Sequence, residues 1–141
     1  MANFDKACIL AENLNKIFPD NVFVAGPSTG FAAHSNLVIE DPELGMFVDR
    51  VPTSADNIQA IGDSSLKSLI FREVFESRNI INRKHRATQI RDRLGKMLPE
   101  HYVIVCVLEL NSQNYRIVGP TKGTAVFAEP EFKHKIVVAL T

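Results

Sequence analysis

The stretch Tyr102-Val103-Ile104-Val105-Cys106-Val107-Leu108-Glu109-Leu110 decides the fold. Its apolar residues occupy both alternating sets of positions, with Ile104, Cys106 and Leu108 in one set and Val103, Val105 and Val107 in the other. Successive side chains of a strand point to opposite faces of a sheet, so this strand must be covered on both faces. We therefore expect a central strand with helices on one side and a second layer on the other. That layer is formed either by the amino-terminal strands or by a neighbouring chain.

Three further extended runs follow this strand: Tyr115 to Val118, Thr124 to Ala128 and Phe132 to Leu140. The turn Gly119–Gly123 and the earlier segment Gly26–Gly30 share a Gly-Pro-x-x-Gly pattern, which is typical of hairpin turns. Glycine-rich loops can also hold phosphate. These two lack the Lys-Ser/Thr pair of a P-loop and do not open into a helix, which favours the turn.

Periodic apolar residues predict three helices, over Phe4–Phe18, Leu66–Arg78 and Arg83–Leu98. Pro19 and Pro99 end the first and third, and Asn82 is placed to cap the third. Extended runs at Val22–Ala25, Phe31–Ile39 and Met46–Val51 lie between the first two helices. The expected order is α-β-β-β-α-α-β-β-β-β, an α+β fold with antiparallel-rich sheets packed by three helices.

The chain has 141 residues, 45% hydrophobic and 23% charged, which is typical of a single globular domain over 1–141. It has no apolar run of the roughly 18 to 20 residues that a membrane helix needs, and its start does not read as a signal peptide. We expect a cytoplasmic protein without membrane contact, or a virion component if the chain is viral. Its two cysteines are then expected to be reduced.

Two helix-Pro-strand units, near 4–39 and 83–128, indicate a partial internal duplication. Ala7–Val24 aligns with Ala87–Ile104 at an offset of 80, and Pro19 matches Pro99. Gly26–Ala32 aligns with Gly119–Ala125 at an offset of 93, which implies an extra strand and turn in the second copy. True duplication and a chance likeness between two units of the same type both remain open.

No residue set predicts catalysis, a metal site or a cofactor. The four histidines lack ligand spacing, and neither cysteine lies in a Cys-x-x-Cys motif. Cys106 and His134 could be imagined as a nucleophile and its base, but Cys106 alternates with Ile104 and Leu108 and should point into the core. We therefore expect a non-enzymatic protein.

The helix at 66–78 has a wider apolar surface than one sheet can cover. Leu66, Ile70 and Val74 form its stripe, while Phe71 and Phe75 widen the stripe on one side and Leu69 lies on the other flank. Either the helix is sandwiched inside the domain, or Phe71 and Phe75 meet another subunit. In the second case Phe71, Phe75 and Leu69 are the candidate interface residues.

The helix at 83–98 is basic. Lys84 and Arg91 border its apolar stripe on one edge, and Arg86 and Arg93 border it on the other. The candidate contacts for a nucleic acid or another acidic partner are Arg83, Lys84, Arg86, Arg91 and Arg93. No aromatic residues are interleaved with them, so the stacking part of a single-strand binding signature is missing. A solvated or interface rim is the alternative interpretation.

The charge is unevenly spread along the chain. Residues 1–65 carry three basic and nine acidic residues, whereas residues 66–101 carry nine basic and four acidic residues. Together with the wide apolar helix, this split predicts a structural or adaptor subunit that self-associates, head to tail, into a larger assembly such as a viral one. Nucleic-acid binding through the basic helix is the alternative.

The last 75 or so residues, with two helices and then four strands, resemble the dynein light chains in element order. The Trp-His-Cys strand start and the Gly-Ser-Tyr/Phe-Val-Thr-His segment of that family are absent. A resemblance of element order alone implies no function, because many unrelated domains share the same order.

Overall fold

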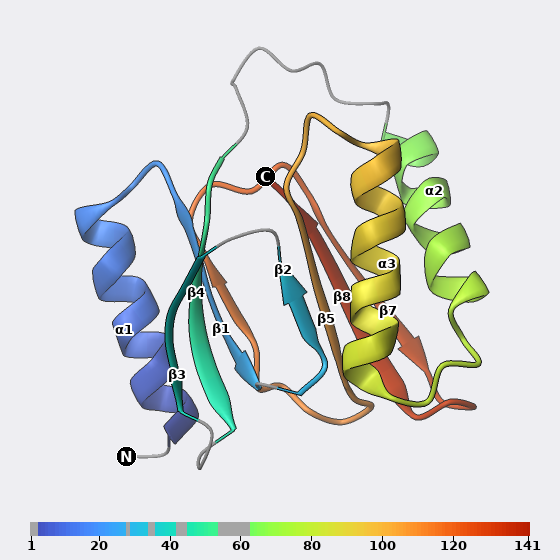
Figure 1. Ribbon diagram of the computed structural model, residues 1–141, viewed down its shortest axis with the longest axis horizontal. Helices are drawn as coiled ribbons and strands as arrows, with labels where there is room; N and C mark the ends of the chain where they lie inside the picture. The colour runs from blue at the N-terminus through green and yellow to red at the C-terminus, as the bar shows by residue number, and fades with distance from the viewer. Residues whose placement is uncertain (1–2, 28, 34–35, 42–44, 54–62) are drawn as a thin grey trace.

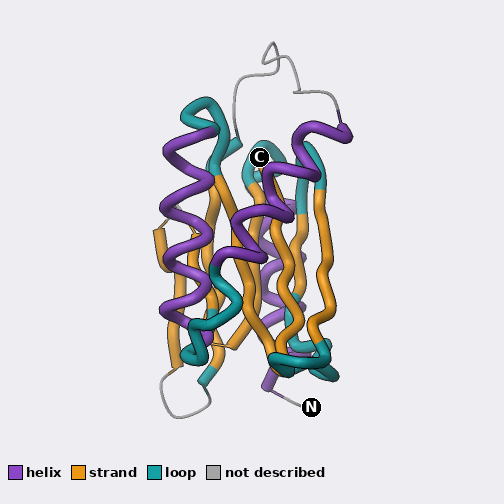
Figure 2. Tube along the Cα trace, turned by 90° about the vertical axis from the view of Figure 1, so that its right-hand side faces the viewer, coloured by secondary structure: helices purple, strands orange, loops and turns teal. Residues whose placement is uncertain are grey.

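A computed structural model describes residues 3–27, 29–33, 36–41, 45–53 and 63–141. Its elements form four layers, which are helix α1, a first sheet, a second sheet, and the pair α2 and α3 (Figure 1). Viewed from the side of this helix pair, α2 and α3 lie in front of the strands (Figure 2). The expected α+β class with antiparallel sheets and three helices is confirmed.

The elements run in the order α1 Asn3–Ile17, β1 Val22–Pro27, β2 Phe31–Ala33, β3 Asn36–Asp41, β4 Met46–Val51, α2 Asp63–Glu76, α3 Arg83–Met97, β5 Val103–Glu109, β6 Arg116–Val118, β7 Thr124–Glu129 and β8 His134–Leu140. The predicted cap of α3 is present, because Asn82 Oδ1 accepts from the His85 backbone N–H at 3.0 Å. One expectation was wrong: the run Phe31–Ile39 contains two strands, β2 and β3, that belong to different sheets.

The two sheets exchange a strand. The first sheet has the order β3-β4-β1-β6 and the second β2-β5-β8-β7, and neighbouring strands pair antiparallel. The amino-terminal half thus contributes β2 to the edge of the second sheet, beside β5. The carboxy-terminal half contributes β6 to the edge of the first sheet, beside β1. Neither sheet is built from one half of the chain alone.

The two halves of the chain have the same strand pairing, residue by residue. Ala25 on β1 pairs with Val48 on β4 and with Arg116 on β6. Val105, 80 residues later on β5, pairs with Val138 on β8 and with Ala32 on β2. The topology α-β-β-β-β therefore occurs twice, and the alignment at an offset of 80 joins equivalent helices and strands.

The alignment at an offset of 93 joins turns that are not equivalent. The glycine-rich segment near Gly30 links β1 to β2, whereas the one at Gly119–Gly123 links β6 to β7. Each link crosses from the first sheet to the second, so the prediction of hairpin turns was wrong. Gly30 has φ +97°, and a Cβ added there would lie 2.3 Å from the Val107 carbonyl oxygen, so the crossing requires glycine.

The central strand β5 is covered on both faces, as its sequence predicts. Val103, Val105 and Val107 pack under α2 and α3 in one core cluster. Ile104 and Cys106 pack against the strands of the first sheet in a second cluster between the two sheets. The second layer is therefore the first sheet of the same chain, with β1, β3 and β4 from the amino-terminal half and β6 from the carboxy-terminal half.

Candidate docking surface on α2 and β7

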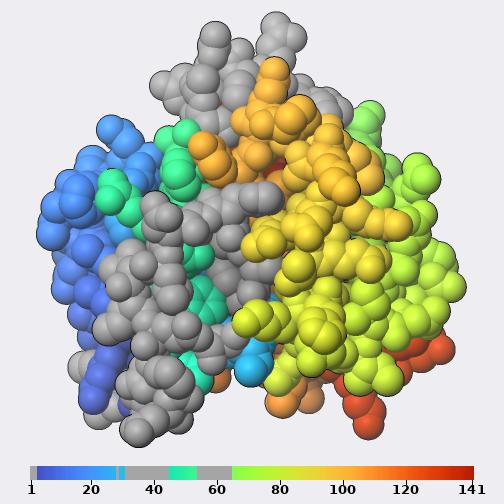
Figure 3. Space-filling model, in the orientation of Figure 1, coloured from blue at the N-terminus to red at the C-terminus, as the bar shows by residue number. Residues whose placement is uncertain are grey.

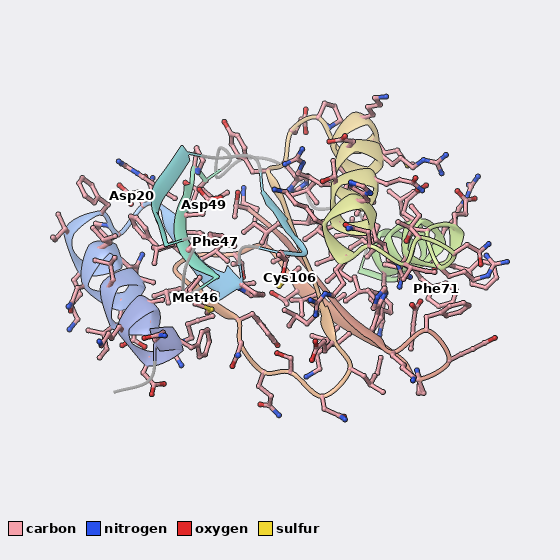
Figure 4. All side chains as sticks on the ribbon, turned by 60° about the horizontal axis from the view of Figure 1, so that its bottom comes forward. Asp20, Met46, Phe47, Asp49, Phe71 and Cys106 are labelled. Carbon is pink, nitrogen blue, oxygen red and sulfur yellow. The ribbon has the colours of Figure 1, made fainter. Side chains whose placement is uncertain are left out.

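Helix α2 lies on the outside of the second sheet and is covered on one side only. Ile70 and Val74 are buried in the core beneath it. Phe71 and Phe75 are 54% and 49% exposed, so the alternative in which α2 is sandwiched inside the domain was wrong. Phe71 lies at the outer rim of the molecule, whereas Cys106 lies in the middle (Figure 4).

Three aromatic rings form one surface at this rim. The ring centroids of Phe71 and Phe75 are 6.2 Å apart, and those of Phe71 and Phe127 on β7 are 6.1 Å apart. The guanidinium of Arg78 lies 3.9 Å from the centroid of the Phe75 ring, a cation–π contact. Phe71, Phe75 and Phe127 are called the phenylalanine surface below.

Leu69 does not belong to this surface. It is partly buried and packs against the core cluster that α2 and α3 share. Between the two helices, Glu73 and Glu76 of α2 form ion pairs with Arg93 of α3, at 3.4 and 2.7 Å. The contacts that the structure gives Leu69 therefore belong to the packing of the domain.

Strand β7 extends the phenylalanine surface to the edge of the second sheet, because β8 is its neighbour on one side only among the described strands. The Leu140 N–H donates to the Gly123 carbonyl at 3.0 Å. In an antiparallel ladder such bonds occur at alternate residues, so the backbone groups of Thr124, Val126 and Ala128 point away from β8. Val126 is also 52% exposed.

A shallow groove adjoins this edge, between the start of α2 and the start of β7. It is lined by Leu66, Lys67 and Ile70 of α2, by Lys122 and the first residues of β7, and by Leu140 of β8. In the space-filling view, α2 forms the right-hand flank of the molecule, with the turn between β7 and β8 below it (Figure 3). The candidate site is thus an apolar, basic-rimmed flank with an open strand edge.

The basic helix α3 is largely neutralised within the chain. Arg83 pairs with Glu109 at 3.3 Å, Arg91 with Asp92 at 3.1 Å, and Arg93 with the acids of α2. Lys84 is exposed, and no acidic side chain of the described residues forms an ion pair with it. The excess of basic residues in this part of the sequence therefore does not give α3 a face of unpaired positive charges.

Arg86, the fifth of these basic residues, is fully buried. Its Nη1 donates to Glu129 Oε1 at 2.5 Å and lies 2.9 Å from His134 Nδ1. Its Nε donates to Ser77 Oγ at 2.9 Å, and its Nη2 donates to the Val74 carbonyl at 2.8 Å. This network joins α2, α3, β7 and β8, and it leaves Arg86 no exposed surface for a phosphate.

His134 is held neutral in this network. Burial lowers its pKa below the ordinary value of 6.5, and the neighbouring Arg86 cation lowers it further, while Glu129 acts in the opposite direction. A neutral ring can accept at Nδ1 from Arg86, so its protonation would remove a buried hydrogen bond. His134 is a structural member of the Arg86 network.

Cys106 and His134 cannot act as a pair. Cys106 pairs with Val137 and faces the first sheet, whereas His134, three residues earlier on β8, lies on the opposite face. Burial raises the pKa of the Cys106 thiol to about 12, which disfavours the reactive thiolate. In the part of the chain that the structure describes, no three His, Cys, Asp or Glu side chains are grouped to hold a metal.

Two members of the site, Val126 and Phe127, were missed from the sequence. Their run is a typical strand, and whether a strand lies at an edge depends on pairings that the sequence of that strand does not contain. The signal that could have pointed to them is the uncharged stretch from Gly123 to Ala128, bounded by Lys122 and Glu129.

Comparisons with known proteins identify no relative. No family model matches the chain, and neither a curated protein nor a solved structure matches it. Among the described helices, none is both long and apolar enough to cross a membrane.

Proposed function

We propose that this protein is a non-enzymatic structural or adaptor subunit that self-associates through the phenylalanine surface and the adjoining edge of β7. The observation that carries the proposal is the pair of half-exposed rings Phe71 and Phe75, stacked on a helix whose opposite side is buried. Large aromatic side chains at the centre of an apolar patch are the usual anchors of protein interfaces.

Nucleic-acid binding through α3 has less support. Of the five basic residues that suggested it, Arg86 is buried, and Arg83, Arg91 and Arg93 form ion pairs within the chain. An exposed ion pair contributes little stability and can reopen. Binding of a nucleic acid that weakens steeply as the salt concentration rises would therefore support this alternative.

The proposal is tested by sedimentation velocity of the full chain at about 1 to 100 μM. We expect association of the wild type and at least a ten-fold higher dissociation constant for the double variant Phe71→Gln, Phe75→Gln. Ile81→Gln is the matched control, because Ile81 is 88% exposed and lies in the link between α2 and α3, outside the surface. A wild type that is monomeric at 100 μM would contradict the proposal.

A further inference from the structure

We infer that two copies of the chain join antiparallel along β7, so that their second sheets become one continuous eight-stranded sheet with the two-fold axis at Val126. The inference rests on the proposed self-association and specifies its partner, strand and register. It follows from the pattern of free backbone groups, the charges at the ends of β7 and the position of the phenylalanine surface.

The backbone of β7 presents a complete set of unpaired groups. Thr124, Val126 and Ala128 direct N–H and C=O groups outward, and the structure assigns these groups no partner among the described residues. The bonds of β8 agree with this pattern, since Leu140 bonds toward β7 while Thr141 bonds toward Tyr102 on the β5 side. An added strand would find three outward residues in regular alternation.

The charges of the segment make it complementary to itself. From Gly123 to Ala128 no side chain is charged, Lys122 precedes this stretch, and Glu129 and Glu131 follow it. In an antiparallel pair the beginning of one strand meets the end of the other. Glu129 is already paired with Arg86, so Lys122 of each copy then lies near Glu131 of the other, and no like charges in this segment are set opposite each other.

The register follows from the number of bonds. Centring the pair on Val126 sets Thr124 of one copy opposite Ala128 of the other, so all three outward residues of each strand are used. Moving the centre to Phe127 would set Thr124 opposite Pro130, which has no N–H to donate. The register centred on Val126 therefore makes the most hydrogen bonds without involving a proline.

The phenylalanine surfaces then meet at the same axis. Neighbouring strands are about 4.8 Å apart, and Phe71 packs on Phe127 of β7 itself. The exposed rings of Phe71 and Phe75 in the two copies are thus brought together over the joined strands. Stable interfaces bury about 1,200–2,000 Å², more than two strand edges provide alone, and the four half-exposed rings supply apolar area there.

Cysteine cross-linking in a Cys8→Ser background tests the register; Cys106 stays because it is buried. Val126→Cys should give a disulfide-linked dimer on mild oxidation, because the two Cα atoms would lie about 5.5 Å apart. Thr124→Cys alone should not, because the two Cα atoms would lie about 14 Å apart. A mixture of Thr124→Cys with Ala128→Cys should link. Linking by Thr124→Cys alone would overturn the register.

Two sets of variants test the pairing in solution. Val126→Pro removes an outward N–H without breaking the ladder to β8, and should raise the dimer dissociation constant at least ten-fold while the circular dichroism stays unchanged. Val126→Lys is the second variant should the proline disturb folding. Lys122→Glu and Glu131→Lys should each weaken the dimer, and the two together should restore it, since the reversed charges again face each other.

The outcomes separate this inference from the proposed function. If the Val126→Pro and Val126→Lys variants dimerise as tightly as the wild type, the β7 pairing is overturned, whereas self-association through another surface still holds. If the wild type is monomeric at 100 μM, both the β7 pairing and the proposed self-association are overturned. A third outcome is that the wild type forms larger species, that Val126→Pro abolishes them, and that Val126→Cys gives no disulfide-linked dimer. This outcome would mean that β7 pairs with a different strand edge of the other copy, and it would overturn the two-fold pairing.

Discussion

Helices α1 and α3 occupy equivalent places on the two sheets, yet they are held very differently. Along α1 only Ala11 is buried, and the helix lies alone on the first sheet. Along α3 four residues are buried, Arg86, Ala87, Ile90 and Leu94, and α2 packs beside it. The repeated α-β-β-β-β units thus provide a symmetric frame, and the insertion of α2 makes one side of it different. Both the Arg86 network and the phenylalanine surface arise from that insertion.

The largest expected effect concerns the frame itself, which depends on both halves. Neither fragment 1–53 nor fragment 63–141 should fold alone, because each lacks the strand that the other lends and exposes the core between the sheets. Co-expressed, they should reassemble into a protein with the wild-type circular dichroism. Cooperative thermal unfolding of fragment 63–141 by itself would mean that the second sheet does not need β2 or the first sheet.

The next largest effect is a loss of stability that distinguishes α3 from α1. Arg86→Met leaves Glu129 and the Val74 carbonyl without their buried partner, and breaking such a pair costs about 3 to 5 kcal/mol. Because the Glu129 side chain is partly exposed, we expect the loss in the free energy of unfolding to lie near the lower end of this range.

Lys6→Met is the matched control for this loss, because Lys6 precedes Arg86 by 80 residues and is exposed at the equivalent position of α1. It should change the free energy of unfolding by no more than about 0.5 kcal/mol. Urea unfolding of both variants measures the difference, and equal losses would show that the Arg86 network adds no stability.

The same contrast explains what could be predicted from the sequence. The helices, the central strand and its two-sided cover follow from local periodicity, because apolar spacing reports how each element meets its neighbours. The exchange of β2 and β6 could not be predicted, because a three-residue strand has no periodicity to show which sheet it joins. The bend that separates β2 from β3 in the run Phe31–Ile39 was missed for the same reason.

The candidate site was predictable in part. The width of the apolar stripe on α2 identified Phe71 and Phe75, because helical geometry alone places them away from Ile70 and Val74. Leu69 was assigned to the same surface because a helical wheel does not show that α3 lies on its flank. Arg86 was grouped with exposed cations because its partners Glu129 and His134 follow it by 43 and 48 residues.

The smallest expected effect is a pH dependence of stability that arises from the Arg86 network. Because the folded state lowers the pKa of His134, the unfolded chain binds more protons as the pH falls below about 6.5, and the free energy of unfolding must then decrease. The loss should begin near pH 6.5 and continue down to the lower pKa of the folded state. His134→Gln keeps an acceptor for Arg86 but cannot titrate, so urea unfolding between pH 7.5 and 5.5 should show a shallower decrease than in the wild type. His85→Gln, at an exposed position of α3, should keep the wild-type decrease. An unchanged slope in His134→Gln would mean that the buried ring accepts a proton without disturbing Arg86, and the network would then tolerate a second cation beside the first.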